Sequence, residues 1–203
     1  MIMRKGIFTV LSLATAGALA AGVSAVPAQA QTPSPVVVTQ STGASLPVNT
    51  ALPLKAVERF FPEVTQVVSV GPDSTAVGRP TATVAVVFAD PTGTMKVTVS
   101  ADLYGSASAA TAAFRQASRA AGAVPGFTPL TTPSLGTATT GGTVTMDGET
   151  HIGIGVLDGS HIIGVTLAGF DATPANTARL VALVRATVTA ADAAVGAATT
   201  AAR

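Results

Sequence analysis

The stretch Thr150–Ala168, THIGIGVLDGSHIIGVTLA, is the most regularly patterned part of the chain. It predicts two strands joined at Asp158-Gly159, a dipeptide that tolerates the positive φ angles of a tight hairpin turn. A two-residue turn at that point would place Val156 opposite His161. One face of the hairpin is then wholly apolar and has to be covered, and it consists of Ile152, Ile154, Val156, Ile163, Val165 and Leu167. The other face is small or polar and consists of His151, Gly153, Gly155, Gly164 and Thr166.

The N-terminus has the pattern of a secretory signal peptide over residues 1–30. Arg4 and Lys5 precede an uncharged apolar run, and Ala28-Gln29-Ala30 forms a small-x-small cleavage site. The alternative is a signal retained as a membrane anchor, but the Pro-rich sequence after Ala30 favours cleavage. No later apolar run is long enough to span a membrane. We therefore expect a secreted, periplasmic or cell-envelope protein without a transmembrane span after cleavage.

Charge and cysteine content exclude several classes of partner. The chain has 11 Lys and Arg and 10 Asp and Glu, so that loss of Arg4 and Lys5 leaves nine basic and ten acidic residues. This near-neutral balance argues against nucleic acid and against docking on anionic lipid, because both need a basic surface. The chain has 0 Cys, which excludes disulfides, thiolate metal sites and lipid attachment at Cys. The domain must therefore be held together by its own core.

The rest of the chain predicts a tether and a single domain of helices and strands. Residues 31–49 are rich in Pro, Ser and Thr and predict a disordered tether before a single domain over residues 50–196. Residues 197–203 are expected to fray. The expected elements of the domain, in chain order, are a helix at Thr50–Phe61, a strand at Val64–Val70, a hairpin of Thr81–Asp90 and Thr94–Leu103, a helix from a Ser106 cap through Ala121, a strand at Thr143–Met146, the central hairpin, and a helix from a Thr173 cap to Gly196.

Three details of this map depend on the turns. The hairpin around residues 90–93 is expected to place Ala89 opposite Thr94. A three-residue loop, Asp147-Gly148-Glu149, is expected before the central hairpin, because it puts Val144 on the same face as Ile152. Residues 122–142 are expected to lack regular structure, which is unusual in a compact domain.

The order of elements predicts the fold class. A short helix is followed by strand-strand-strand-helix twice. We expect an α+β domain with an antiparallel sheet of about six strands and helices packed on it.

Two passages resemble a group of known proteins. They are MKVTVSADLYGSASAATAAFRQA and VLDGSHIIGVTLAGFDATPANTARLVALVRATVTAAD. Both look like small exported actinobacterial proteins, among them mycobacterial lipoproteins and sensor-kinase ectodomains of the Mog1/PsbP-like α/β sandwich type. The resemblance covers roughly Thr81–Val195 and rests on apolar periodicity and Ala-rich helices. The chain departs from the group in lacking a lipid-attachment Cys and a Cys pair. The resemblance implies a binding or adaptor role without catalytic residues.

The residues most similar to a metal site are Asp147, Glu149 and His151. Glu149 and His151 are two apart and would project to one side of a strand, with Asp147 across the turn, so that together they could hold Zn²⁺ or Mn²⁺. The alternative is a solvated turn with an exposed strand histidine. We favour the alternative, because His161 would lie on the opposite face and cannot join. We expect no metal and no other cofactor.

The second histidine, His161, begins the apolar face of the central hairpin. As a general base it would need an orienting acid and a nucleophile, and Asp158 and Ser160 project differently from the turn. We favour a histidine at the rim of the core, hydrogen-bonded to backbone or water. The chain contains no nucleophile elbow, zinc-protease, phosphate-loop or dinucleotide motif.

The glycine-bearing face of the central hairpin is the candidate binding surface. Glycine weakens a strand unless a backbone, a ring or a ligand comes close. Either residues 122–142 or a helix covers this face, or it is a shallow platform for a ligand or partner. We expect a non-enzymatic domain that binds a partner protein, an envelope component or a small apolar ligand. The alternatives are an enzyme of unrecognised class that uses Asp147, Glu149, His151 or His161, and a structural envelope protein.

The signal pattern makes a direct prediction. Secreted protein should begin at Gln31, because the small-x-small site ends at Ala30. N-terminal sequencing of exported material tests this, and a protein that still began at Met1 would contradict it.

Overall fold

The computed structural model describes residues 53–201. The expected signal peptide and tether lie outside these residues. Within them the elements in chain order are α1 (Leu54–Glu58), β1 (Gln66–Gly71), β2 (Ala82–Ala89), β3 (Lys96–Leu103), α2 (Ala107–Gly122), β4 (Thr128–Pro129), β5 (Ala138–Met146), β6 (Glu149–Asp158), β7 (His161–Ala168) and α3 (Pro174–Ala201).

All of these strands belong to one antiparallel sheet with the order β1-β2-β3-β7-β6-β5-β4. The expected α+β class is confirmed, as is the short helix before the strands. The two strand-strand-strand-helix halves meet at the middle of the sheet, where β3 pairs with β7. The sheet has seven strands because the short β4 adds to one edge.

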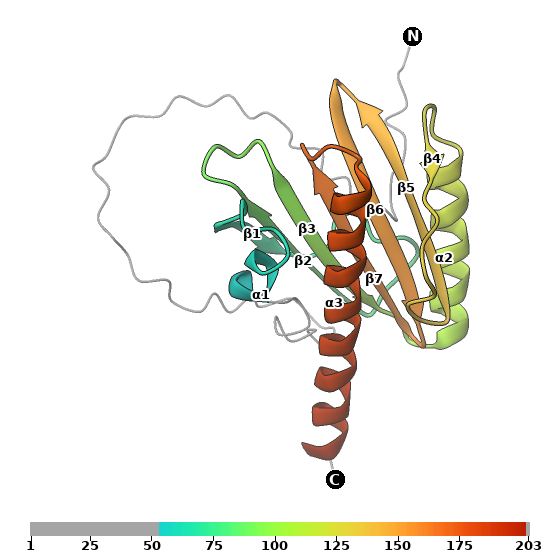
Figure 1. The fold of residues 1–203 in the computed structure, drawn as a ribbon. Coiled ribbons are helices and arrows are strands. Elements are labelled where there is room, and N and C mark those ends of the chain that lie inside the picture. Colours follow the sequence, from blue (N-terminus) through green and yellow to red (C-terminus); the bar gives the residue numbers. More distant parts are fainter. Residues whose placement is uncertain (1–52, 202–203) are drawn as a thin grey trace, which may run out of the picture.

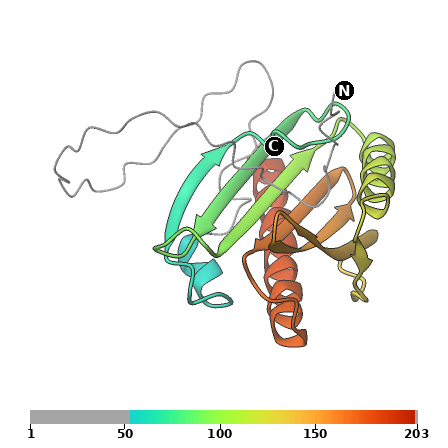
Figure 2. The same cartoon turned by 90° about the horizontal axis from the view of Figure 1, so that it is seen from above.

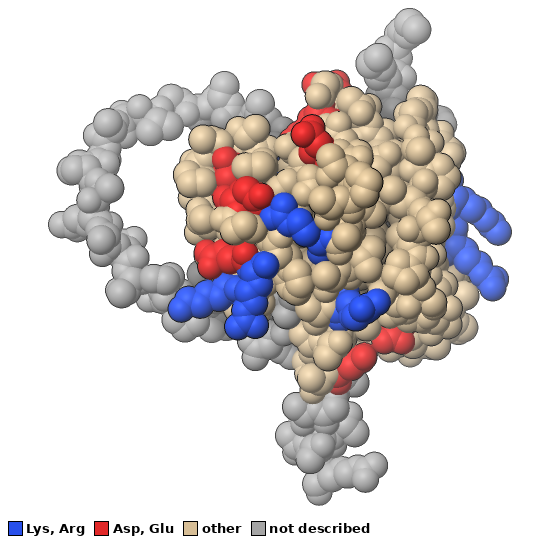
Figure 3. Space-filling model, viewed as in Figure 1, with Lys and Arg blue, Asp and Glu red and all other residues tan. Residues whose placement is uncertain are grey.

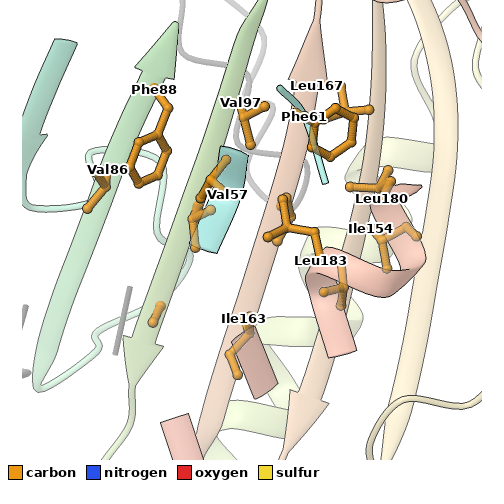
Figure 4. Close-up of a cluster of buried hydrophobic side chains, with 14 of the residues drawn as sticks. Val57, Phe61, Val86, Phe88, Val97, Ile154, Ile163, Leu167, Leu180 and Leu183 are labelled. Atoms are coloured by element: carbon orange, nitrogen blue, oxygen red, sulfur yellow. The ribbon is translucent and has the colours of Figure 1, made fainter. Parts of the chain in front are cut away.

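The three helices lie on opposite sides of the sheet. Figures 1 and 2 show α1 and α3 on one side and α2 on the other. The main core lies under α1 and α3, and Figure 4 shows it in detail. Leu180 and Leu183 of α3, Val57 of α1 and Phe61 of the segment after α1 are fully buried there. They cover an apolar sheet face formed by Val84, Val86, Phe88, Val97, Val99, Ile152, Ile154, Val156, Ile163, Val165 and Leu167.

Two hairpins have the predicted faces but a different register. In the central hairpin Val156 pairs with Ile163 and Asp158 with His161, so that the turn consists of Gly159 and Ser160. In the β2–β3 hairpin Ala89 pairs with Lys96, not with Thr94. Both registers differ from the expectation by two residues. Because side chains alternate with a period of two, this shift leaves every residue on its predicted face.

The expected three-residue loop before the central hairpin is wrong. Met146 pairs with Glu149, and the turn consists of Asp147 (φ 51°) and Gly148 (φ 81°), as a type I′ turn requires. Val144 therefore lies opposite His151, on the side of α2. The prediction failed because it assumed that only one face of the sheet is buried, whereas Val144 is 2% exposed on the other face.

The segment expected to lack structure contains β4 and the first part of β5. Glycine permits this arrangement at Gly142, where a Cβ atom would lie 2.2 Å from the ring of Phe127. Phe127 packs against Ala121 of α2, and Leu130 and Leu135 pack against the main core.

Two helices begin at the predicted N-cap residues, but the last helix does not end where the sequence predicted. Ser106 Oγ accepts a hydrogen bond from the Ala109 amide at 3.1 Å, and Thr173 Oγ1 accepts one from the Asn176 amide at 3.2 Å. The last helix does not end at Gly196 but continues to Ala201.

One arginine connects α3 to the segment after α1. The Arg179 guanidinium lies 4.5 Å from the centre of the Phe61 ring, and its Nη2 donates to the Glu63 carboxylate at 2.7 Å. Its Nε donates to the Phe60 carbonyl. The Arg179 side chain thus fixes the segment around Phe61 against α3, where Phe61 also makes an edge contact with Phe170.

The buried position of Ile163 yields a test of the core. Ile163→Ala removes methyl groups from the core under α3 and should lower the free energy of unfolding by about 2–4 kcal/mol. Ile162 lies on the other face, where it is 7% exposed and packs in a cluster with α2, so Ile162→Ala should cost a similar amount. Chemical denaturation measures both. A nearly neutral Ile162→Ala variant would show that α2 does not cover this face.

Candidate functional site

The sheet face toward α2 differs in chemistry from the apolar face. Most of its side chains are polar or small, although the central strands are buried there as well. We call it the polar face. Its buried polar residues are Thr98, Ser100, Asp102, His151 and Thr166, each at most 7% exposed. Its small residues include Ala85, Gly153, Gly155 and Gly164.

Strand pairing arranges these residues in rows across the sheet. Thr166 lies between Thr98 of β3 and Gly153 of β6. In the next row Gly164 lies between Ser100 and Gly155. Two glycines thus face each other across β6 and β7, which leaves this part of the sheet without side chains. The five residues that the sequence suggested as a binding surface lie on this one buried face.

Residues of β3 extend the polar face beyond the central hairpin. The pairing of β3 with β7 brings Thr98 beside Thr166 and Ser100 beside Gly164. Asp102 was missed. The alternation Thr98, Ser100, Asp102 was its available signal, because these positions share one face of a strand.

Helix α2 packs on one end of the polar face. Its residues Ala110 and Phe114 pack in a small cluster with Tyr104, Leu157 and Ile162. The small side chains of the helix allow this close approach. The rows that contain Gly164 and Thr166 lie farther along the strands, and their residues are not part of the cluster around Ala110 and Phe114 of α2.

Three buried atoms on the polar face lack a hydrogen-bond partner among residues 53–201. They are Asp102 Oδ1, His151 Nδ1 and Thr166 Oγ1. Leaving a buried polar group unpaired costs on the order of 1–3 kcal/mol. Buried polar groups are otherwise almost always paired, so three such atoms on one sheet face require an explanation.

Asp102 is the most strongly perturbed of these groups. Burial, and then the negative charge of Asp73, raises the pKa of Asp102 to about 8. Asp73 belongs to the loop between β1 and β2, where its carboxylate accepts from the Thr75 amide at 2.8 Å. The Asp73 amide in turn donates to Thr83 Oγ1 at 2.8 Å, and Thr83 is the strand partner of Asp102. The loop thus holds a second carboxylate close to the end of the polar face.

A groove opens at the edge of the polar face. It has a volume of about 180 Å³ and lies between the segment Ser69–Thr75 and the sheet residues Ala85, Val87 and Thr98. Thr98 therefore belongs both to the groove and to the buried row that contains Thr166.

The structure separates the residues of the suggested metal site. His151 Nε2 lies 3.5 Å from the Glu149 carboxylate, and burial lowers the pKa of His151, which favours the neutral imidazole. His151 is buried, so the expectation of an exposed strand histidine is wrong. Asp147 is exposed in the turn and lines an open cleft of about 450 Å³, which Glu149 and Asp171 also line and to which His151 does not belong. In the described part of the chain, no three His, Asp or Glu side chains are placed to hold a metal ion.

His161 lies at the rim of the apolar face, as expected. It pairs with Asp158 at the end of the hairpin, and its Nε2 has no hydrogen-bond partner in the described range. Asp192 of α3 lies close by, and burial and the neighbouring Asp158 raise the pKa of Asp192. Ser160 lies in the turn, and its backbone carbonyl accepts from the Tyr104 amide at 2.9 Å. This arrangement contains two acids and an imidazole, but it aligns no hydroxyl with His161.

The raised pKa of Asp102 predicts a pH dependence of stability. The folded protein holds the Asp102 proton more tightly than the unfolded chain, in which the pKa of Asp is about 4. The contribution of Asp102 to stability should therefore be greatest below pH 4, fall as the pH rises toward 8, and change no further above it. Asp102→Asn stays neutral and should flatten this fall, so that the variant is more stable than the wild type at pH 8.

Urea unfolding at pH 5 and pH 8 measures the effect, with the exposed Asp171→Asn as the matched control. An equal loss of stability in the wild type and in Asp102→Asn would contradict the assignment.

The surface gives no sign of a strongly charged field on the side of α1 and α3. Figure 3 shows scattered basic and acidic side chains separated by large uncharged areas, in agreement with a charged fraction of only 10%. None of the helices within residues 53–201 combines the length and the hydropathy needed to cross a membrane.

Comparison with known proteins finds similarity at the level of the fold. No protein-family model matches the chain. No curated protein matches it significantly. Among solved structures, the extracellular domain of PknH from Mycobacterium tuberculosis is similar, with a TM-score of 0.50 and 11% sequence identity. The match covers 69% of this chain and 93% of that one. The chain thus shares its fold with a mycobacterial extracellular domain, as the resemblance of its sequence implied.

Proposed function

We propose that this chain is an exported, non-enzymatic binding domain and that its polar face receives a ligand or partner with hydrogen-bonding groups. The observation that carries the proposal is the set of three buried, unpartnered atoms on that face, Asp102 Oδ1, His151 Nδ1 and Thr166 Oγ1. A bound molecule that donates to Asp102 and exchanges hydrogen bonds with Thr166 would remove their energetic cost.

The small residues of the polar face support the same function. Glycines at positions 153, 155 and 164 keep the sheet surface free of side chains, so another molecule can approach the backbone closely. The groove beside Thr98 gives such a molecule an entrance from the edge of the sheet. Ligand sites typically combine a largely apolar surface with a few placed polar groups, and the polar face has small residues and a few such groups.

The surroundings of the two histidines favour binding over catalysis. A nucleophilic enzyme places a hydroxyl or thiol within hydrogen-bond reach of a base. His151 faces Glu149, and His161 faces two carboxyl groups, so neither histidine is paired with a nucleophile from residues 53–201. The fold shared with an extracellular domain agrees with a binding role, and export rests on the signal pattern of residues 1–30.

A pair of threonine variants tests the proposal. Immobilised mature domain is incubated with cell-envelope extract, and bound proteins and lipids are identified by mass spectrometry. Thr166→Val keeps the shape of the side chain and removes an unpartnered hydroxyl, so stability should stay the same or rise slightly. Capture of the specific ligand should fall about three- to tenfold, which corresponds to one lost hydrogen bond.

Thr187→Val is the matched control. The Thr187 hydroxyl is buried on α3, away from the polar face, and donates to the Leu183 carbonyl at 2.9 Å. This variant should lose about 0.5–1 kcal/mol of stability and retain full capture. If Thr166→Val captured the same molecules in the same amounts as the wild type, the polar face would not be the binding site.

A further inference from the structure

The first strand leaves one edge of the sheet with exposed apolar side chains. Val67 is 47% exposed and Val68 is 57% exposed, and they are the large hydrophobic side chains that stand out to solvent within the described range. Four of the six residues of β1 are exposed. Figure 1 shows β1 at the end of the sheet opposite to β4.

The two edges of the sheet differ in how they avoid further pairing. The far edge ends in β4, which has two residues and includes Pro129, and both features prevent a new strand from adding. By contrast, β1 has six residues, QVVSVG, with no charge and no proline. Its one protective feature is the bulge at Val68. Free N–H and C=O groups along such an edge accept another strand.

The chain carries a segment with matching properties before the described residues. Residues 36–42, VVVTQST, lie between Pro35 and Gly43, and five of these seven residues are β-branched. The sequence from residue 31 to residue 54 contains no charged residue. We propose that residues 36–42, in place of the disordered tether expected from the sequence, pair with the free edge of β1 in the same chain and cover Val67 and Val68.

The connection is long enough for this pairing. Ten residues, 43–52, separate the segment from Pro53 and span up to about 33 Å when extended. A strand of six residues is only about 20 Å long. The connection to β1 also includes α1, and a connection that contains a helix permits parallel as well as antiparallel pairing. The segment can therefore reach β1 in either direction.

Hydrogen exchange tests the pairing without a known ligand. The proteins compared are the mature chain from Gln31, a chain that begins at Ser45, and the mature chain with Val36→Asp and Val38→Asp. The matched control carries Gln31→Asp and Ser34→Asp, which add the same charge outside the segment. All four retain residues 53–201, and size-exclusion chromatography shows whether each is a monomer.

In the mature chain and in the control, the β1 amides that are not bonded to β2 should exchange at least tenfold more slowly than in the other two proteins. Equal exchange in all four proteins would overturn the proposal. Slow exchange confined to a dimeric fraction would also overturn it, because a second copy would then occupy the edge. The outcome is independent of the polar face, since β1 exchange and ligand capture are separate measurements.

Discussion

The sheet has to be covered on both faces, and the rest of the structure depends on this constraint. The inner six residues of β3 and of β7 are buried without interruption, and so are seven consecutive residues of β6. A strand that is buried on both faces needs a layer on each side. Helices α1 and α3 supply one layer with leucines and valines, and the Ala-rich α2 packs on the other face. The polar face is therefore buried as well, and α2 packs on one end of it.

The sequence predicted which face of each hairpin strand is apolar, but it did not predict the pairing registers of the hairpins, and the reason is physical. Apolar alternation fixes which side of a strand is buried, but a shift by two residues conserves that pattern. The turns then decide the register, and the Asp158-Gly159 dipeptide suggested a turn one residue too early, since Gly159 and Ser160 form it. The loop before β6 failed differently. Its Asp147-Gly148 pair is a strong type I′ signal, but the assumption of one-sided burial outweighed it.

Only part of the candidate site could be predicted from the sequence. His151, Gly153, Gly155, Gly164 and Thr166 lie on one hairpin, so local alternation was enough to group them. Thr98, Ser100 and Asp102 join them only because β3 pairs with β7, and these strands are about 60 residues apart in the chain. No local pattern encodes such a pairing. The groups that perturb Asp102 were also hidden, because Asp73 reaches it from a loop.

The composition of the polar face is hard to explain by packing alone. Burial of apolar area contributes about 25 cal/mol per Å², and the glycines at positions 153, 155 and 164 bring no side chain to this contribution. Glycine there also loses more backbone entropy on folding than any other residue. An unpaired Thr166 hydroxyl and a buried Asp102 carboxyl lower stability further. These three features all lower stability and lie on one face of the sheet. Proteins typically retain such destabilising features at functional sites, which agrees with the proposed binding role.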